Sequence, residues 1–134
     1  MPGRCNFTDI HWPIRWEGGR PAITAAAVAC LFNAGEYDSK YVPKLLSYCK
    51  GKLSDISNRG FGHWHYAHYY YSQVRYREGG KDWEDYRDPI YARIISEAGT
   101  DGSWNQGYIG PVYTTAINLA VLQLENGALP IYQR

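Results

Sequence analysis

The hydrophobic and polar positions divide most of the chain into helical segments that end at glycines. Residues 23–34 (ITAAAVACLFNA) are apolar on nearly every side, which predicts a short helix buried all round and ended by Gly35. Residues 64–78 (WHYAHYYYSQVRYRE) contain no glycine or proline and stop at Gly79-Gly80, so they predict a helix despite their tyrosines. We therefore expect an all-α fold.

Two further segments have the pattern of amphipathic helices. The first is expected between a cap at Asp38 or Ser39 and an end at Gly51, with Pro43 in or near its first turn. Its apolar positions recur at helical spacing: Val42, Leu45, Leu46 and Cys49. The second is expected from a cap at Asp82, and Pro89 should kink or split it. Its apolar face consists of Trp83, Tyr86, Ile90 and Ile94, opposite Glu84, Asp85, Arg87 and Asp88.

A fifth helix is predicted from Pro111, which suits a first helical position, to Leu124. It is expected to be another buried helix, with a packed stripe of Tyr113, Ala116, Ile117, Ala120 and Leu124. Residues 1–21 contain scattered prolines and glycines and read as an irregular segment, so residues 22–134 form the expected folded domain. Asn126-Gly127 turns the chain into a short tail, LPIYQR.

Three glycines mark a repeat within this domain. Gly35, Gly79 and Gly127 each end an apolar or aromatic helix, and they stand 44 and 48 residues apart (79−35 and 127−79). Such a period is typical of HEAT or armadillo solenoids as well as of closed α/α barrels. The alternation of apolar and amphipathic helices favours one ring of helices inside another. We expect about five helices that form an open arc of an α/α toroid.

Composition excludes several classes of partner. The 14 basic and 13 acidic residues give a net charge of +1, which leaves no basic face for nucleic acid. The longest apolar stretch, residues 25–32, is far shorter than the roughly 20 residues of a membrane span. Residues 1–12 have no continuous apolar signal region, so the compartment stays open. Cys5, Cys30 and Cys49 form no disulfide framework or metal pair, and we expect Cys30 and Cys49 to be buried.

The loop motif Asp101-Gly102-Ser103-Trp104 resembles the Q-x-x-D-G-S-W (QW) repeat of triterpene cyclases, although Glu97 or Ala98 stands in place of the glutamine. The stretch from Thr24 to Arg134 resembles bacterial proteins with prenyltransferase and squalene oxidase repeats. The resemblance implies a toroid of the terpenoid cyclase and protein prenyltransferase superfamily, normally of about six helix pairs, of which this chain is the C-terminal part. It gives the four motif residues a structural role, with the tryptophan stacked in the loop.

Histidines near residue 65 raise the question of a metal. His65 and His68 share a helix face at a spacing that can hold one ion. Protein prenyltransferase β-subunits have a zinc-ligand histidine in a Y-H-x-x-Y context, which His68 and Tyr71 match in part. The other ligands of that family, an Asp and a Cys, are missing around residues 20–24. We therefore expect no zinc or other cofactor, with His68 as a weak candidate ligand.

The acid of squalene-hopene cyclases, a D-x-D-D cluster that protonates an alkene, does not occur here. Aromatic rings can instead stabilise cations or line a pocket. The candidate pocket residues stand near the starts of the apolar helices: His65, Tyr66, His68, Tyr69 and Tyr113. The resemblance implies a cyclase-like protein that binds an apolar, isoprenoid-type ligand, and these aromatic residues are the expected lining of its cavity. The alternatives are a non-catalytic binding or interaction scaffold and, third, a zinc prenyltransferase-like subunit. An open arc should also associate with the remainder of a toroid or with itself.

Overall fold

The computed structural model describes residues 20–60 and 62–127, and every regular element within them is helical. The α-helices are α1 (Pro21–Asn33), α2 (Val42–Leu53), α3 (Trp64–Glu78), α4 (Gly80–Ser96) and α5 (Pro111–Leu122), followed by the 3-10 turn η2 (Leu124–Asn126). The expected all-α class is confirmed. None of the described helices is both long and apolar enough to cross a membrane.

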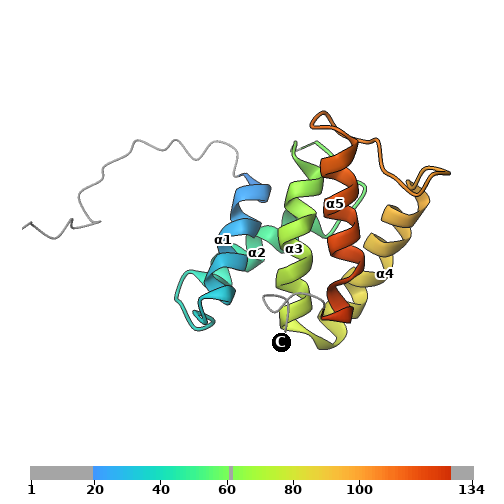
Figure 1. Cartoon of the computed structure of the whole chain (residues 1–134). Coiled ribbons are helices and arrows are strands. Elements are labelled where there is room, and N and C mark those ends of the chain that lie inside the picture. Colours follow the sequence, from blue (N-terminus) through green and yellow to red (C-terminus); the bar gives the residue numbers. More distant parts are fainter. Residues whose placement is uncertain (1–19, 61, 128–134) are drawn as a thin grey trace, which may run out of the picture.

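The helices form two layers (Figure 1). Helices α1, α3 and α5 lie side by side and run in the same direction, while α2 and α4 return behind them. Helix α3 lies in the middle, against α1 on one side and α5 on the other. Its side chains Ala67, Tyr71 and Val74 are almost completely buried. The expected alternation of helices between two layers is therefore present over this part of the chain.

Two of the three predicted glycines end helices of the front layer, which consists of α1, α3 and α5. Gly35 follows α1 and Gly79 follows α3, whereas α5 ends at Leu122 and Gly127 ends the 3-10 turn η2. Gly35, Gly79 and Gly127 have φ values of 79°, 71° and 58°, a left-handed conformation that a side chain would strain. After α1, Gly35 donates to the carbonyl of Phe32 and Glu36 donates to the carbonyl of Leu31, a Schellman ending. The predicted repeat of glycines is therefore a repeat of turns that follow α1, α3 and η2.

Several predicted helix limits are wrong. Neither Asp38 nor Ser39 caps α2, which begins at Val42, and the helix continues through Gly51 to Leu53. Helix α4 begins at Gly80 rather than after a cap at Asp82, because Gly79 and Gly80 both adopt positive φ and turn the chain directly into the next helix. Pro89 does not split α4: it lies on the exposed face, where water can satisfy the carbonyl left without its helical donor. The helix also buries its predicted face, Trp83, Tyr86, Ile90 and Ile94.

The two outer members of the front layer are less buried than predicted. Helix α1 is not buried all round, since Ile23 is 57% exposed and Cys30 is exposed, contrary to expectation. Cys49 is buried as predicted. Helix α5 ends at Leu122, and its buried positions are Thr114, Asn118 and Val121. Of the predicted stripe only Leu124 is buried, and it lies in η2. Both helices have one neighbour in their layer, so one flank of each stays open.

Residues 1–19 of the predicted irregular segment, including Cys5, lie outside the described residues. The tail LPIYQR also lies outside them.

Candidate functional site

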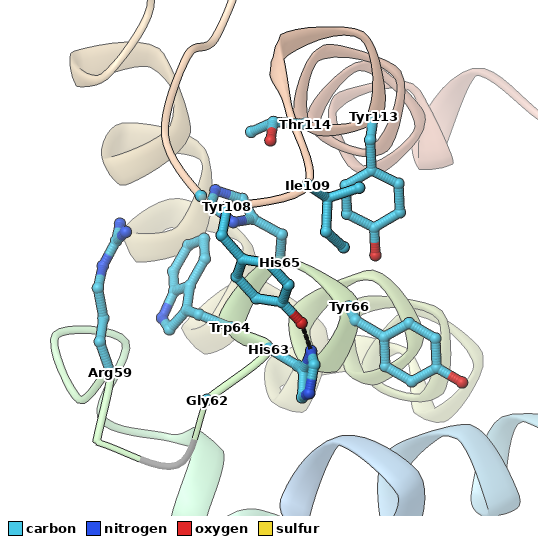
Figure 2. A pocket seen from close by; sticks show the side chains of 11 residues that line it. Arg59, Gly62, His63, Trp64, His65, Tyr66, Tyr108, Ile109, Tyr113 and Thr114 are labelled. Atoms are coloured by element: carbon cyan, nitrogen blue, oxygen red, sulfur yellow. Dashed lines mark hydrogen bonds between the residues drawn. The ribbon is translucent and has the colours of Figure 1, made fainter.

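An open depression with a volume of about 660 Å³ lies between the first residues of α1, the first residues of α3, and the loop that leads into α5. Its apolar lining comes from separate parts of the chain: Ile23, Tyr66, Tyr108, Ile109 and Tyr113. Arg20 and His63 add polar groups at the same place. A smaller hollow of about 130 Å³ adjoins it and reaches Arg59, Trp64, His65 and Thr114 (Figure 2). No described carboxylate lines either space.

The start of α3 is shaped by two residues in the left-handed region. Gly62 has a φ of 69°, and His63 has a φ of 50° and is the one described residue other than glycine with positive φ. Such a conformation costs a side-chain-bearing residue on the order of 1 kcal/mol and is often found at functional sites. It directs the His63 ring to Tyr108, whose hydroxyl lies 2.7 Å from His63 Nδ1 (Figure 2).

The loop between α4 and α5 is held over α3 by further contacts. Gln106 donates to the carbonyl of Glu97 at 2.8 Å, and the Thr114 hydroxyl donates to the carbonyl of Gln106 at 2.7 Å. Gly107 passes close to His65, and a Cβ there would lie 3.6 Å from His65 Nδ1. These contacts give the exposed Tyr108 and Ile109 a defined position at the edge of the depression.

His65 is a nearly buried titratable residue that lines the smaller hollow. Its side chain is 8% exposed, and its Nε2 atom has no hydrogen-bond partner in the protein. Burial lowers the pKa of His65, the Arg59 charge lowers it further, and Glu97 opposes both. The imidazole is therefore neutral at pH 7, and its Nε2 atom is buried without a partner in the protein.

A charged cluster supports the back of this hollow. The Arg59 guanidinium lies 2.6 Å from Glu97 and 4.5 Å from the centre of the Trp64 ring. Glu97 also pairs with Arg93 at 2.6 Å, and the Trp64 indole donates to the carbonyl of Ile56. The cluster fixes the Trp64 ring as a wall, because its cation, carboxylate and indole N–H each have a partner.

Three tyrosines share the larger space. The pKa of Tyr113 is raised, first by burial and then by its neighbours Tyr66 and Tyr108. Tyr66 also packs edge-on against Tyr70, with the ring centres 4.9 Å apart. The raised pKa keeps the Tyr113 hydroxyl protonated at neutral pH. The three rings present electron-rich surface to the depression.

The five residues expected to form a pocket fall into different places. Tyr66 and Tyr113 line the depression, and His65 lines the adjoining hollow. His68 is 1% exposed and stacks on Tyr86 of α4, with its Nδ1 atom 2.8 Å from the Tyr86 hydroxyl. Tyr69 lines neither of the two hollows, and its ring lies 5.0 Å from that of Tyr70.

The chemistry around His68 is that of a packed core. Burial, followed by the nearby His65 and Arg59, lowers the pKa of His68 to about 3. Among the described residues, no three His, Cys, Asp or Glu side chains gather in a way that could hold a metal ion. A zinc ion would need at least two further protein ligands beside His68. The Nδ1 atom of His68 instead lies against the hydroxyl of Tyr86 on α4.

The motif Asp101 to Trp104 connects α4 to α5. Asp101 accepts hydrogen bonds from the backbone N–H and the hydroxyl of Ser103, which closes a tight turn. Trp104 is 5% exposed and donates from its indole to the carbonyl of Ile94 at 2.7 Å. Its backbone N–H donates to the Thr115 hydroxyl at 3.0 Å. The motif residues therefore join the two helices and line neither hollow.

Sequence reasoning missed Tyr108 and Ile109 because they stand in a loop that reads as a connection. A usable signal was present: two large apolar residues stand between Gly107 and Gly110, immediately before a helix that begins with proline. Large apolar side chains in so short a loop indicate that the loop packs over another part of the protein or over a binding site.

Comparisons of the chain with protein family models, with curated proteins and with solved structures give no significant match.

Proposed function

We propose that the depression at the starts of α1, α3 and α5 binds an apolar, isoprenoid-type ligand, and that the chain acts as a binding component of a cyclase-like toroid protein. The observation that carries the proposal is the lining, in which three tyrosine rings and two isoleucines surround about 660 Å³. This volume lies in the range of small-molecule sites, which are mostly apolar with a few polar groups.

The chemistry of the lining supports binding more than catalysis. Protonation of an alkene needs a strong acid, and no described carboxylate borders the depression. His65 is held neutral by its surroundings, so it is a poor proton donor at pH 7. Tyrosine rings attract methyl-branched chains by contact area and can also stabilise positive charge. The resemblance to squalene-hopene cyclases supports the isoprenoid class of ligand.

The test is the binding of farnesol, measured by quenching of the intrinsic fluorescence of the full chain and by calorimetry. We expect Tyr113→Ala to weaken binding about tenfold, because removing a ring that contacts the ligand costs about 1–2 kcal/mol. Tyr41→Ala is the matched control, since Tyr41 is 60% exposed and does not line the depression. Equal affinities for the wild type and both variants, or no binding of farnesol, would rule out this site.

A non-catalytic interaction scaffold is the second candidate. Exposed apolar flanks on α1 and α5 favour it, because charge-free helix faces in stacked helical arrays normally meet a neighbour. The zinc prenyltransferase hypothesis has no comparable support, since His68 is occupied within the core.

A further inference from the structure

The front layer of helices ends in two open flanks, and each has an exposed apolar stripe. We call them the α1 stripe, which consists of Ile23, Ala27 and Cys30, and the α5 stripe, which consists of Val112, Ala116 and Leu119. Ile23 is 57% exposed, Val112 is 83% exposed and Leu119 is 41% exposed. These large aliphatic side chains are exposed to solvent and align on one face of each helix. Such an arrangement indicates a contact surface.

Neither flank has the polar outer face that normally ends a helical array. The sequences of α1 and α5 (PAITAAAVACLFN and PVYTTAINLAVL) contain no charged residue. Helices α2 and α4 of the second layer, in contrast, contain several Lys, Arg, Asp and Glu residues. Stacked helical repeats stay soluble when the outer faces of their terminal helices are polar. The uncharged outer faces of α1 and α5 are therefore expected to contact another protein surface.

The two stripes match each other in spacing and in height. Each α5 position follows its α1 counterpart by 89 residues (112−23, 116−27 and 119−30), so both stripes have the same i, i+4, i+7 pattern. Helices α1 and α5 are parallel and start at the same end of the layer (Figure 1). The stripes begin at the third residue of α1 and the second of α5. A parallel α5 placed beside α1 would therefore set Ile23 against Val112, Ala27 against Ala116 and Cys30 against Leu119.

We propose that the α5 stripe of one copy of the chain packs against the α1 stripe of a second copy, with the two helices parallel. Such a contact repeats the side-by-side arrangement that α3 already makes with its two neighbours in the layer. It covers both neutral flanks with one kind of interface, which closes into a ring or extends as a chain of copies. Ile23 belongs to the α1 stripe and also lines the depression, so the second copy adds a wall to the binding site.

The first experiment measures the mass of the full chain by sedimentation equilibrium over a range of concentrations. We expect association to twice 15.3 kDa or a higher multiple. Val112→Lys places a charge in the contact and should weaken association at least about tenfold. Ile95→Lys is the matched control, because Ile95 is 62% exposed on α4, outside both stripes. A wild-type monomer at concentrations on the order of 0.1 mM, well above the Kd of a weak specific interface, would overturn the proposal.

The second experiment tests which residues meet. Ile23→Lys and Val112→Glu should each weaken association when the variant is alone. An equimolar mixture of the two variants should restore it. At one kind of contact in the mixture the introduced lysine meets the introduced glutamate, and at the other both stripes are wild type. Circular dichroism checks that each variant is folded. The absence of restoration in mixtures of folded variants would contradict the parallel pairing.

The third experiment uses the exposed Cys30 in a Cys5→Ser background. Cys49 does not interfere, because it is buried and its thiol pKa is raised to about 12. Under mild oxidation, Leu119→Cys should cross-link to Cys30 of a second copy, while Val112→Cys, far from Cys30 along the helices, should not. Covalent dimers of the Cys5→Ser chain with no introduced cysteine would instead join two Cys30 residues. They would show that two α1 stripes meet and would overturn the proposal.

Discussion

At the scale of single residues, His68 shows how a polar side chain can belong to a core. Its ring is sealed between Trp64 and Tyr86 and has one hydroxyl partner, so the neutral form is strongly favoured. Desolvation outweighs any gain from charge, since no carboxylate contributes to its pKa of about 3. A histidine of this kind specifies how two helices pack and makes the fold sensitive to acid.

Acid destabilises the fold through His68. The folded pKa of His68 lies well below the usual value of 6.5, so the unfolded chain takes up a proton that the folded chain does not. The stability contributed by the neutral ring is complete above pH 6.5 and decreases as the pH falls toward 3. Each pH unit in that range costs about 1.4 kcal/mol. His65, whose pKa is also lowered, adds to the loss.

Urea unfolding of the wild type and of His68→Gln at pH 7.5 and at pH 5 measures this effect. We expect the wild type to lose about 1–2 kcal/mol more than the variant between the two conditions. His63→Gln serves as a control at an exposed histidine of the same segment. An equal loss in all three proteins would show that His68 does not titrate in this way.

At the scale of elements, the Asp101 to Trp104 loop is a brace between layers. Its tryptophan is bonded to the last turn of α4 and to the first turns of α5, and these two helices have few direct contacts with each other. Much of the connection between the helices therefore depends on this one side chain. The structural role that the resemblance to QW repeats implied agrees with these contacts, while the family assignment stays a prediction.

Trp104→Ala is expected to lower the free energy of unfolding by about 3–5 kcal/mol, because it removes a large buried ring. Trp104→Phe keeps most of the packing, loses the bond to the Ile94 carbonyl, and should cost about 1–2 kcal/mol. Urea denaturation followed by circular dichroism gives both values. Similar stabilities of the wild type and Trp104→Ala would contradict the role of a brace.

Sequence patterns located the elements better than they located the buried faces. Helix α3 was predicted with its observed limits because Gly79 and Gly80 stop it and nothing else interrupts it. Trp83 to Ile94 stood out because charged residues occupy the opposite face of α4. Helix α5 has no charged residue, so several of its faces were equally apolar and the buried one could not be identified. Its buried Thr114 donates to the carbonyls of Gln106 and Gly110 in the preceding loop, and hydrophobic periodicity does not predict such hydrogen bonds.

The candidate site was predicted in part for a similar reason. Tyr66 and Tyr113 were found because both stand in the first turn of a front-layer helix. His68 is only two residues beyond Tyr66, yet the turn of the helix takes it to the opposite side, toward α4. Tyr108 comes from a loop whose path depends on Gly107 and His63, and a local pattern does not reveal that path.

At the scale of the whole molecule, the proposed ligand site and the proposed contact between copies share Ile23. A ligand in the depression lies against Ile23 on α1 and against Tyr113, which is next to Val112 of the α5 stripe. If a second copy adds a wall to this space, the ligand gains contacts in the associated state. Binding and association are then coupled, and linkage requires each to strengthen the other by the same factor for each bound ligand.

We therefore expect farnesol to lower the concentration at which the wild type associates, by a few-fold for a coupling of about 1 kcal/mol. The monomeric Val112→Lys variant should bind farnesol correspondingly more weakly, although residue 112 does not line the depression. Sedimentation with and without farnesol, and calorimetry of Val112→Lys against the Ile95→Lys control, measure the two sides of the cycle. Equal farnesol affinity of these two variants would mean that the ligand site and the contact between copies are independent, and would contradict the coupling.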